Sequence, residues 1–92
     1  MQQESAYVLG LQALAWLAAD PDRLQGFMAS SGADPATLAA SASDPEFLGA
    51  VLDHLMQDDQ TVMAFCNDHG LAYTAPQAAR AALPGGEAWN WT

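Results

Sequence analysis

The sequence predicts an all-α fold, a compact bundle of about six short helices. Isoleucine is absent, and valine and threonine together number seven among 92 residues, whereas strands are built from β-branched and aromatic residues in alternation. Alanine and leucine dominate instead, and both are strong helix formers. The length allows one modest core rather than two. Residues 1–86 are therefore predicted to form a single helical domain, followed by a C-terminal tail over residues 87–92.

Aspartate, proline and glycine mark the first three helices. An apolar run in the first twenty residues predicts the first helix. Asp20-Pro21 and Asp34-Pro35 each join an N-cap to a residue suited to the first helical turn. Gly32 suits the left-handed position just past a helix end. The three helices are predicted over Ser5–Ala19, Pro21–Ser31 and Pro35–Ala42.

The same residue types delimit three helices in the second half. Asp44-Pro45 repeats the cap signal, and Asp58-Asp59 supplies acidic residues where a helix start favours them. Thr74-Ala75-Pro76 is a looser version of the cap, and Gly70 suits the left-handed position. These helices are predicted over Pro45–Gln57, Asp59–His69 and Ala75–Leu83.

The two halves of the chain resemble each other at an offset of 38 residues. Five identical pairs superpose: Leu14/Leu52, Leu17/Leu55, Asp20/Asp58, Phe27/Phe65 and Gly32/Gly70. One interpretation is a tandem pair of three-helix units that pack around the first and fourth helices. The other is chance similarity between two amphipathic units.

Helical phase indicates which faces are buried. The fourth helix places six apolar residues within half of its circumference: Phe47, Leu48, Val51, Leu52, Leu55 and Met56. The first helix is apolar nearly all round, because Leu9 and Trp16 lie well away from its main stripe, which is formed by Tyr7, Leu11, Leu14 and Leu17. Such a helix is either the central helix of the monomer or half of an oligomer contact.

Charge and cysteine content exclude several classes of protein. Eleven acidic residues against two arginines, with no lysine, give a formal charge of −9. This balance argues against nucleic acid or an anionic membrane as a partner, since both attract clustered cations. One cysteine excludes an internal disulfide. No segment is long enough to span a bilayer and no targeting signal is seen, so a cytoplasmic location is expected.

The sequence contains three informative runs, Ala13–Pro21, Phe27–Pro35 and Phe47–Leu55. Together they resemble a family of short proteobacterial proteins labelled only as a domain of unknown function, and the resemblance covers about residues 6–86. It implies a small helical bundle. It implies no catalytic residue, cofactor or partner.

Four residues could supply a nitrogen, oxygen and sulfur ligand set for zinc. His54 and Asp58 are four apart, and Cys66 and His69 are three apart, so each pair lies on one helical face. The alternative is structural: His54 and Asp58 flank the apolar face, Cys66 is a small core residue, and His69 lies in a last turn. The structural interpretation is favoured, and no cofactor or metal is predicted.

Two functions from different classes remain. The favoured one is a non-enzymatic, acidic protein–protein interaction module that binds an unidentified protein or a second copy of itself. Its predicted interface is an aromatic patch formed by Leu9, Trp16, Trp89 and Trp91, and the alternative is that the tail covers Trp16 within one monomer. The other function is a small metal-dependent or catalytic protein that uses His54, Asp58, Cys66 and His69.

Overall fold

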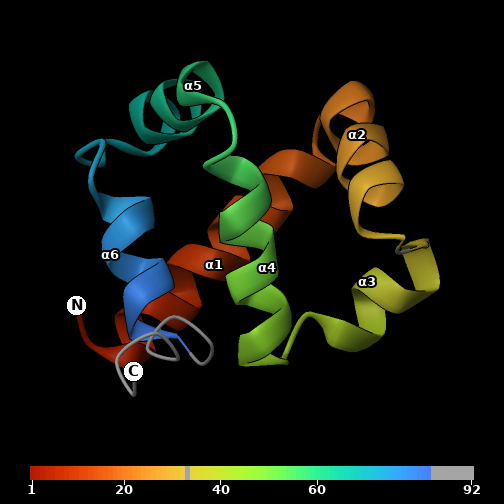
Figure 1. Ribbon diagram of the computed structural model, residues 1–92, viewed down its shortest axis with the longest axis horizontal. Helices are drawn as coiled ribbons and strands as arrows, with labels where there is room; N and C mark the ends of the chain where they lie inside the picture. Colours follow the sequence, from red (N-terminus) through yellow and green to blue (C-terminus); the bar gives the residue numbers. More distant parts are fainter. Residues whose placement is uncertain (33, 84–92) are drawn as a thin grey trace, which may run out of the picture.

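The computed structural model describes residues 1–32 and 34–83, and these residues form six α-helices and no strand (Figure 1). The prediction of an all-α fold is therefore confirmed. The helices are α1 (Gln3–Ala18), α2 (Pro21–Ser31), α3 (Pro35–Ser41), α4 (Pro45–Leu55), α5 (Asp59–His69) and α6 (Ala75–Ala82).

Aspartate side chains start four of the helices, as the sequence predicts. Each accepts a hydrogen bond from a backbone N–H of the helix that it starts: Asp20 from Asp22 (2.9 Å), Asp34 from Thr37 (2.7 Å), Asp44 from Glu46 (3.0 Å) and Asp58 from Gln60 (3.2 Å). These bonds satisfy N–H groups that have no partner within the helix. Thr74 differs, because it precedes α6 but its side chain makes no capping hydrogen bond.

Two glycines end helices in the left-handed conformation. Gly32 follows α2 with φ 75°, and Gly70 follows α5 with φ 65°. Other boundaries differ slightly from the prediction. Helix α4 ends at Leu55 rather than Gln57, because Asp58 must adopt an extended conformation to cap α5.

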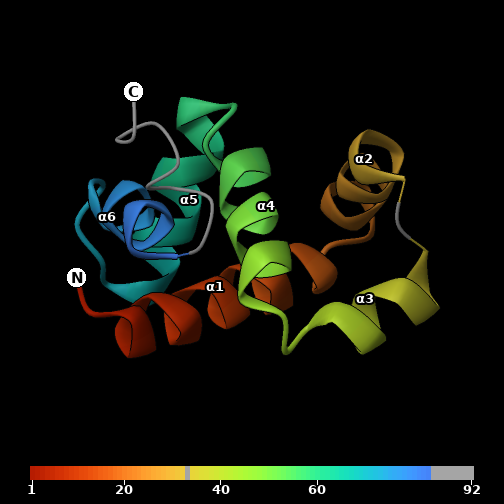
Figure 2. The ribbon, with the colours of Figure 1, turned by 60° about the horizontal axis from the view of Figure 1, so that its bottom comes forward.

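Helix α1 is the central helix of the monomer, which is one of the two roles predicted for it. It packs against α2, α4 and α6, and α4 and α6 also contact each other (Figure 2). The most buried positions of α1 are Ala6, Leu9, Gly10, Ala13, Trp16 and Leu17. The predicted stripe is only partly correct, since Tyr7, Leu11 and Leu14 are half-buried at its side.

Helices α1 and α4 approach each other closely at Gly10. A Cβ atom added to Gly10 would lie 2.9 Å from Cβ of Leu48, closer than two carbon atoms can pack without strain. Leu48 is fully buried, as are Val51, Leu52 and Leu55 on the same face of α4. The missing side chain at Gly10 therefore sets the distance between the two main helices.

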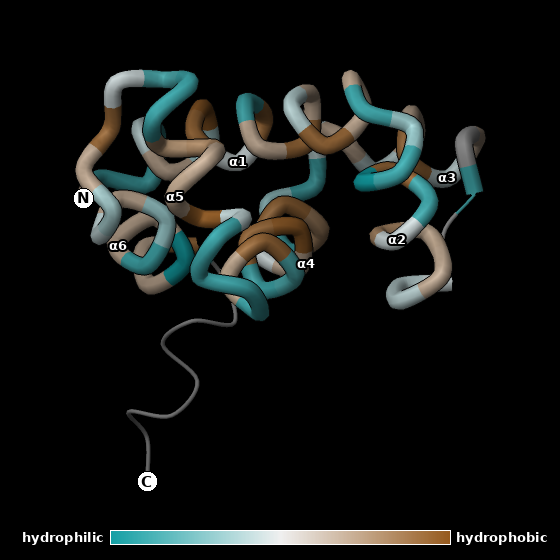
Figure 3. Tube along the Cα trace, turned by 90° about the horizontal axis from the view of Figure 1, so that it is seen from above, coloured by the Kyte–Doolittle hydropathy of each residue, from teal (hydrophilic) through white to brown (hydrophobic). Residues whose placement is uncertain are grey.

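The internal repeat is visible in local structure but not in packing. Phe27 and Phe65 are both buried, and the caps and glycines at equivalent positions have equivalent conformations. In contrast, α6 packs against α1 and α4, whereas α3 lies beside α2 at the opposite end of the molecule (Figures 1 and 3). Among the described side chains of α3, Leu38 is the buried one. Two equally packed units are therefore not observed.

Candidate functional site

The structure places Leu9 and Trp16 in the core rather than on an aromatic surface patch. Leu9 is 5% exposed and Trp16 is 8% exposed, so neither presents a large exposed apolar surface in this structure, and the predicted four-residue interface stays a prediction. The physical reason for the burial is that α5 covers the edge of α1 away from the main stripe: the Phe65 ring packs edge-on against the indole, with ring centroids 5.6 Å apart. Trp89 and Trp91 lie outside the described residues.

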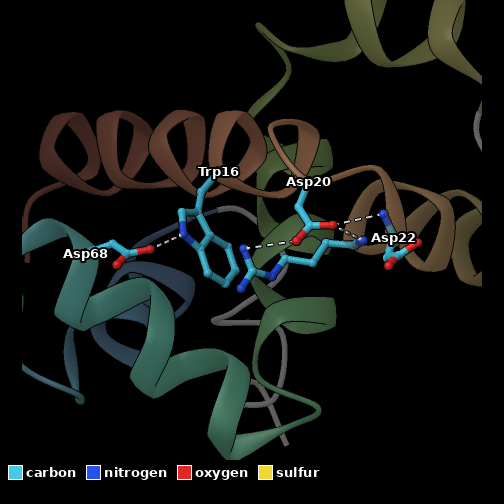
Figure 4. Close-up of polar contacts among 5 residues, drawn as sticks. Trp16, Asp20, Asp22 and Asp68 are labelled. Carbon is cyan, nitrogen blue, oxygen red and sulfur yellow. Dashed lines mark hydrogen bonds and ion pairs between the residues drawn. The ribbon is translucent and has the colours of Figure 1, made fainter.

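Charged side chains from two elements complete the surroundings of Trp16 (Figure 4). The indole Nε1–H donates to Oδ2 of Asp68 on α5 over 2.7 Å. The guanidinium of Arg23 on α2 lies 3.8 Å from the ring centroid, and Asp20 pairs with Arg23 over 3.7 Å. Trp16 thereby joins α1, α2 and α5, which is a structural role.

The first two members of the possible zinc ligand set, His54 and Asp58, have separate structural roles. The His54 ring packs edge-on against Phe27, with ring centroids 5.2 Å apart, and its Nδ1 is buried with no hydrogen-bond partner among the described residues. Asp58 caps α5 and also accepts from the Thr61 hydroxyl over 3.0 Å.

The other two members lie near the end of α5. The Cys66 thiol is buried and donates to the carbonyl of Ala72 over 3.4 Å, and burial raises the pKa of this thiol. The His69 ring packs at a tilt against the Phe65 ring, with ring centroids 4.5 Å apart, and its Nδ1 hydrogen-bonds to the Phe65 carbonyl over 3.0 Å. Among residues 1–32 and 34–83, no three histidine, cysteine or acidic residues are placed to share an ion. The described residues give the alternative zinc site no support.

The acidic residues also have roles in the fold. Besides the four caps, four carboxylates lie in first helical turns, where the helix dipole favours them: Glu4, Asp22, Glu46 and Asp59. Asp53 accepts from Nε of Arg80 over 2.7 Å, and Asp68 accepts from Trp16. Asp53, Asp58 and Asp59, which lie close together in the sequence, therefore each have a structural role.

A groove on the outer side of α1 is the strongest candidate site. Its volume is about 490 Å³, and its apolar lining comes from Met1, Val8, Leu9 and Leu71. Met1 is 54% exposed and Val8 is 49% exposed, so both present apolar surface to solvent. We call this feature the α1 groove.

Polar side chains complete the rim of the α1 groove. They are Gln2, Glu4, Ser5 and Gln12, all of which are exposed. The facing wall is the α5–α6 connection, which is fixed where the Leu71 N–H donates to the Cys66 carbonyl over 2.9 Å. An apolar floor with a polar rim is the usual composition of a protein-binding surface.

A second pocket lies nearby, between α1, α4 and the end of α6. Its volume is about 320 Å³, and it is lined by Gln3, Glu4, Tyr7, Pro45 and Leu83. Glu4 borders both this pocket and the α1 groove. Both concave features therefore lie at the end of the molecule where α1 begins.

Val8 and Leu71 line the α1 groove but are not among the candidate residues that the sequence predicts. Val8 could have been found from helical phase, because it lies four residues before the polar residue Gln12 and therefore on the same helical face. Leu71 carries no such signal, since its position depends on how the α5–α6 connection returns to α1.

Comparison with known proteins gives a family but no function. No curated protein and no solved structure matches the chain. Residues 3–86 match the family described as "Protein of unknown function (DUF3572)", which confirms the resemblance to a domain-of-unknown-function family. The match extends over most of the length of the chain, and the chain therefore belongs to this family.

Proposed function

We propose that this protein is a non-enzymatic, acidic protein–protein interaction module that binds its partner through the α1 groove. The observation that carries the proposal is the exposed apolar surface of Met1 and Val8 along a groove with a polar rim. Apolar side chains left in water at a concave surface favour association, because covering them removes apolar area from water.

The surroundings of the two histidines and the cysteine favour a binding function over a catalytic one. His54 and His69 pack against phenylalanine rings, and the Cys66 thiol is buried and hydrogen-bonded. A catalytic group needs access to a substrate and a partner that activates it. The His54 contact joins α4 to α2, and the contacts of Cys66 and His69 stay within α5 and the connection that follows it.

Cellular setting and partner identity are part of the same proposal. We place the protein in the cytoplasm of a bacterium, as the sequence analysis expects. Among the described residues, no helix combines the length and apolar character that crossing a membrane requires. The partner is proposed to be another protein, with a second copy of this chain as the competing occupant.

Site-specific photo-crosslinking tests the proposal in cells. A benzoylphenylalanine at Val8, on the groove, is compared with one at Ala40, which is exposed on α3. We expect a discrete crosslinked protein from position 8 and none from position 40. Equal crosslinking from both positions, or none from either, would contradict an interaction module that uses this groove.

A further inference from the structure

We propose that the α1 groove receives a basic amphipathic segment of the partner, with apolar side chains in the groove and lysine or arginine against its rim. This inference rests on the proposed function and specifies the chemistry of its partner. It combines two independent features: the apolar lining of the groove, with Glu4 on its rim, and the acidic balance of the whole chain.

The apolar lining suits the side chains of a peptide. Val8 and Met1 are about half exposed, while Leu9 and Leu71 form the deeper surface. A volume of about 490 Å³ lies within the range of roughly 300–1,000 Å³ typical of ligand-binding clefts. Helical segments commonly bind such grooves through apolar residues spaced at i, i+3, i+4 and i+7.

The charge of the surface selects a cationic segment. Glu4 is exposed on the rim of the groove, and none of the described carboxylates is buried. The two arginines of the chain both face carboxylates, Arg23 at Asp20 and Arg80 at Asp53. With a formal charge of −9, the protein attracts cationic partners from a distance and repels anionic ones.

The same electrostatics disfavour a second copy in the groove. Two copies would each carry a charge of −9, and each would bring its own acidic residues to the contact. Like charges across an interface oppose binding. A basic segment experiences the opposite effect, so it is the occupant that the surface favours.

Three synthetic peptides of 16 residues test the occupant. The first carries leucines on one helical face and lysines on the other, the second replaces its leucines with serine, and the third replaces its lysines with glutamate. Fluorescence anisotropy is measured with fluorescein-labelled peptides at low and high salt. We expect the first peptide to bind at least about tenfold more tightly than either of the others, and more weakly as salt is raised.

Paired variants locate the binding site. Val8→Ser removes an exposed apolar side chain from the groove, and Met63→Ser removes one of similar exposure, 43%, that does not line it. Val8→Ser should weaken binding of the first peptide by roughly five- to tenfold, and Met63→Ser should leave it unchanged. Circular dichroism confirms that both variants are folded, which is expected because both side chains are exposed.

A second pair tests the rim. Glu4→Gln removes the charge at the groove, whereas Asp22→Asn removes a first-turn charge on α2, at the other end of α1 (Figure 2). Glu4→Gln should weaken binding by roughly two- to threefold and reduce its salt dependence. Asp22→Asn should have a smaller effect on both quantities.

Three results would overturn the inference. Equal binding of the leucine and serine peptides would mean that charge alone attracts them. Equal affinity of Val8→Ser and Met63→Ser would place the binding elsewhere. Light scattering that shows a dimer dissociated by Val8→Ser would assign the groove to a second copy. In each case the crosslinking experiment still decides the proposed function, because it assumes nothing about the charge of the partner.

Discussion

Replacing Gly10 with alanine tests whether the close crossing of α1 and α4 determines the stability of the fold. The new Cβ atom would lie 2.9 Å from Cβ of Leu48, about 0.6–1.1 Å inside the normal carbon–carbon contact distance. Because a Cβ atom cannot rotate away, the helices must separate or the buried leucine must shift. Overpacking of this kind costs about 1–3 kcal/mol of unfolding free energy.

Gly26 on α2 provides the matched control. A Cβ atom at Gly26 meets no atom within 4 Å, and this glycine has no positive φ. Both substitutions gain about 1 kcal/mol from the higher helix propensity of alanine. The difference between the two variants therefore isolates the packing cost at the crossing.

Thermal and urea denaturation followed by circular dichroism measure this difference. Gly26→Ala should melt above the wild type, and Gly10→Ala should melt below Gly26→Ala by at least about 4 °C, since 1 kcal/mol corresponds to roughly 4–8 °C in a domain of this size. Equal stabilisation by both substitutions would refute the argument. It would mean that α1 and α4 are not held at the observed separation.

Four further predictions concern the core, the caps and metal. Phe27→Ala and Phe65→Ala should each lower the unfolding free energy by about 3–5 kcal/mol, because both rings are buried; a melting temperature within two degrees or so of wild type would contradict this. Trp16→Phe should cost about 1–3 kcal/mol in urea denaturation, because it removes the indole N–H that donates to a carboxylate; an unchanged midpoint would argue against that bond. The hydrogen bond from the Thr37 backbone N–H lowers the pKa of Asp34 below its usual value. This cap should therefore stabilise α3 fully at any pH above the usual pKa, and the stabilisation should be lost as the pH falls through the lowered pKa. Amide exchange of Thr37 measured by NMR should show this dependence, and Asp34→Asn should abolish it. A strong chelator should leave the helicity and the melting temperature unchanged, and stoichiometric zinc whose loss lowers stability would contradict this.

Local chemistry explains why the helix starts and ends could be predicted. An aspartate before a helix accepts from an N–H two or three residues ahead, so Asp20 and Asp44 act within their own segments. The left-handed conformation of Gly32 and Gly70 is likewise a property of the residue and its neighbours. These features need no knowledge of the rest of the fold.

Contacts between distant segments explain what could not be predicted. Helical phase shows that α1 is apolar nearly all round, but the burial of Trp16 depends on Asp68 and Phe65, about 50 residues away. The α1 groove depends in the same way on Leu71, whose place is set by the α5–α6 connection. Periodicity identifies apolar faces and does not identify their partners.

The buried thiol of Cys66 makes the wall of the groove accessible to kinetic measurement. It is the single cysteine of the chain. Its thiol donates a hydrogen bond to the carbonyl of Ala72, the residue that follows Leu71 in that wall. A thiol reagent can reach it only when the connection lifts or α5 separates. Labelling as slow as global unfolding would mean that the wall and the bundle open as one unit. Faster labelling would mean that the connection, alone or together with α5, opens while the rest of the bundle stays folded, so that the native protein repeatedly loses and re-forms one side of its own groove.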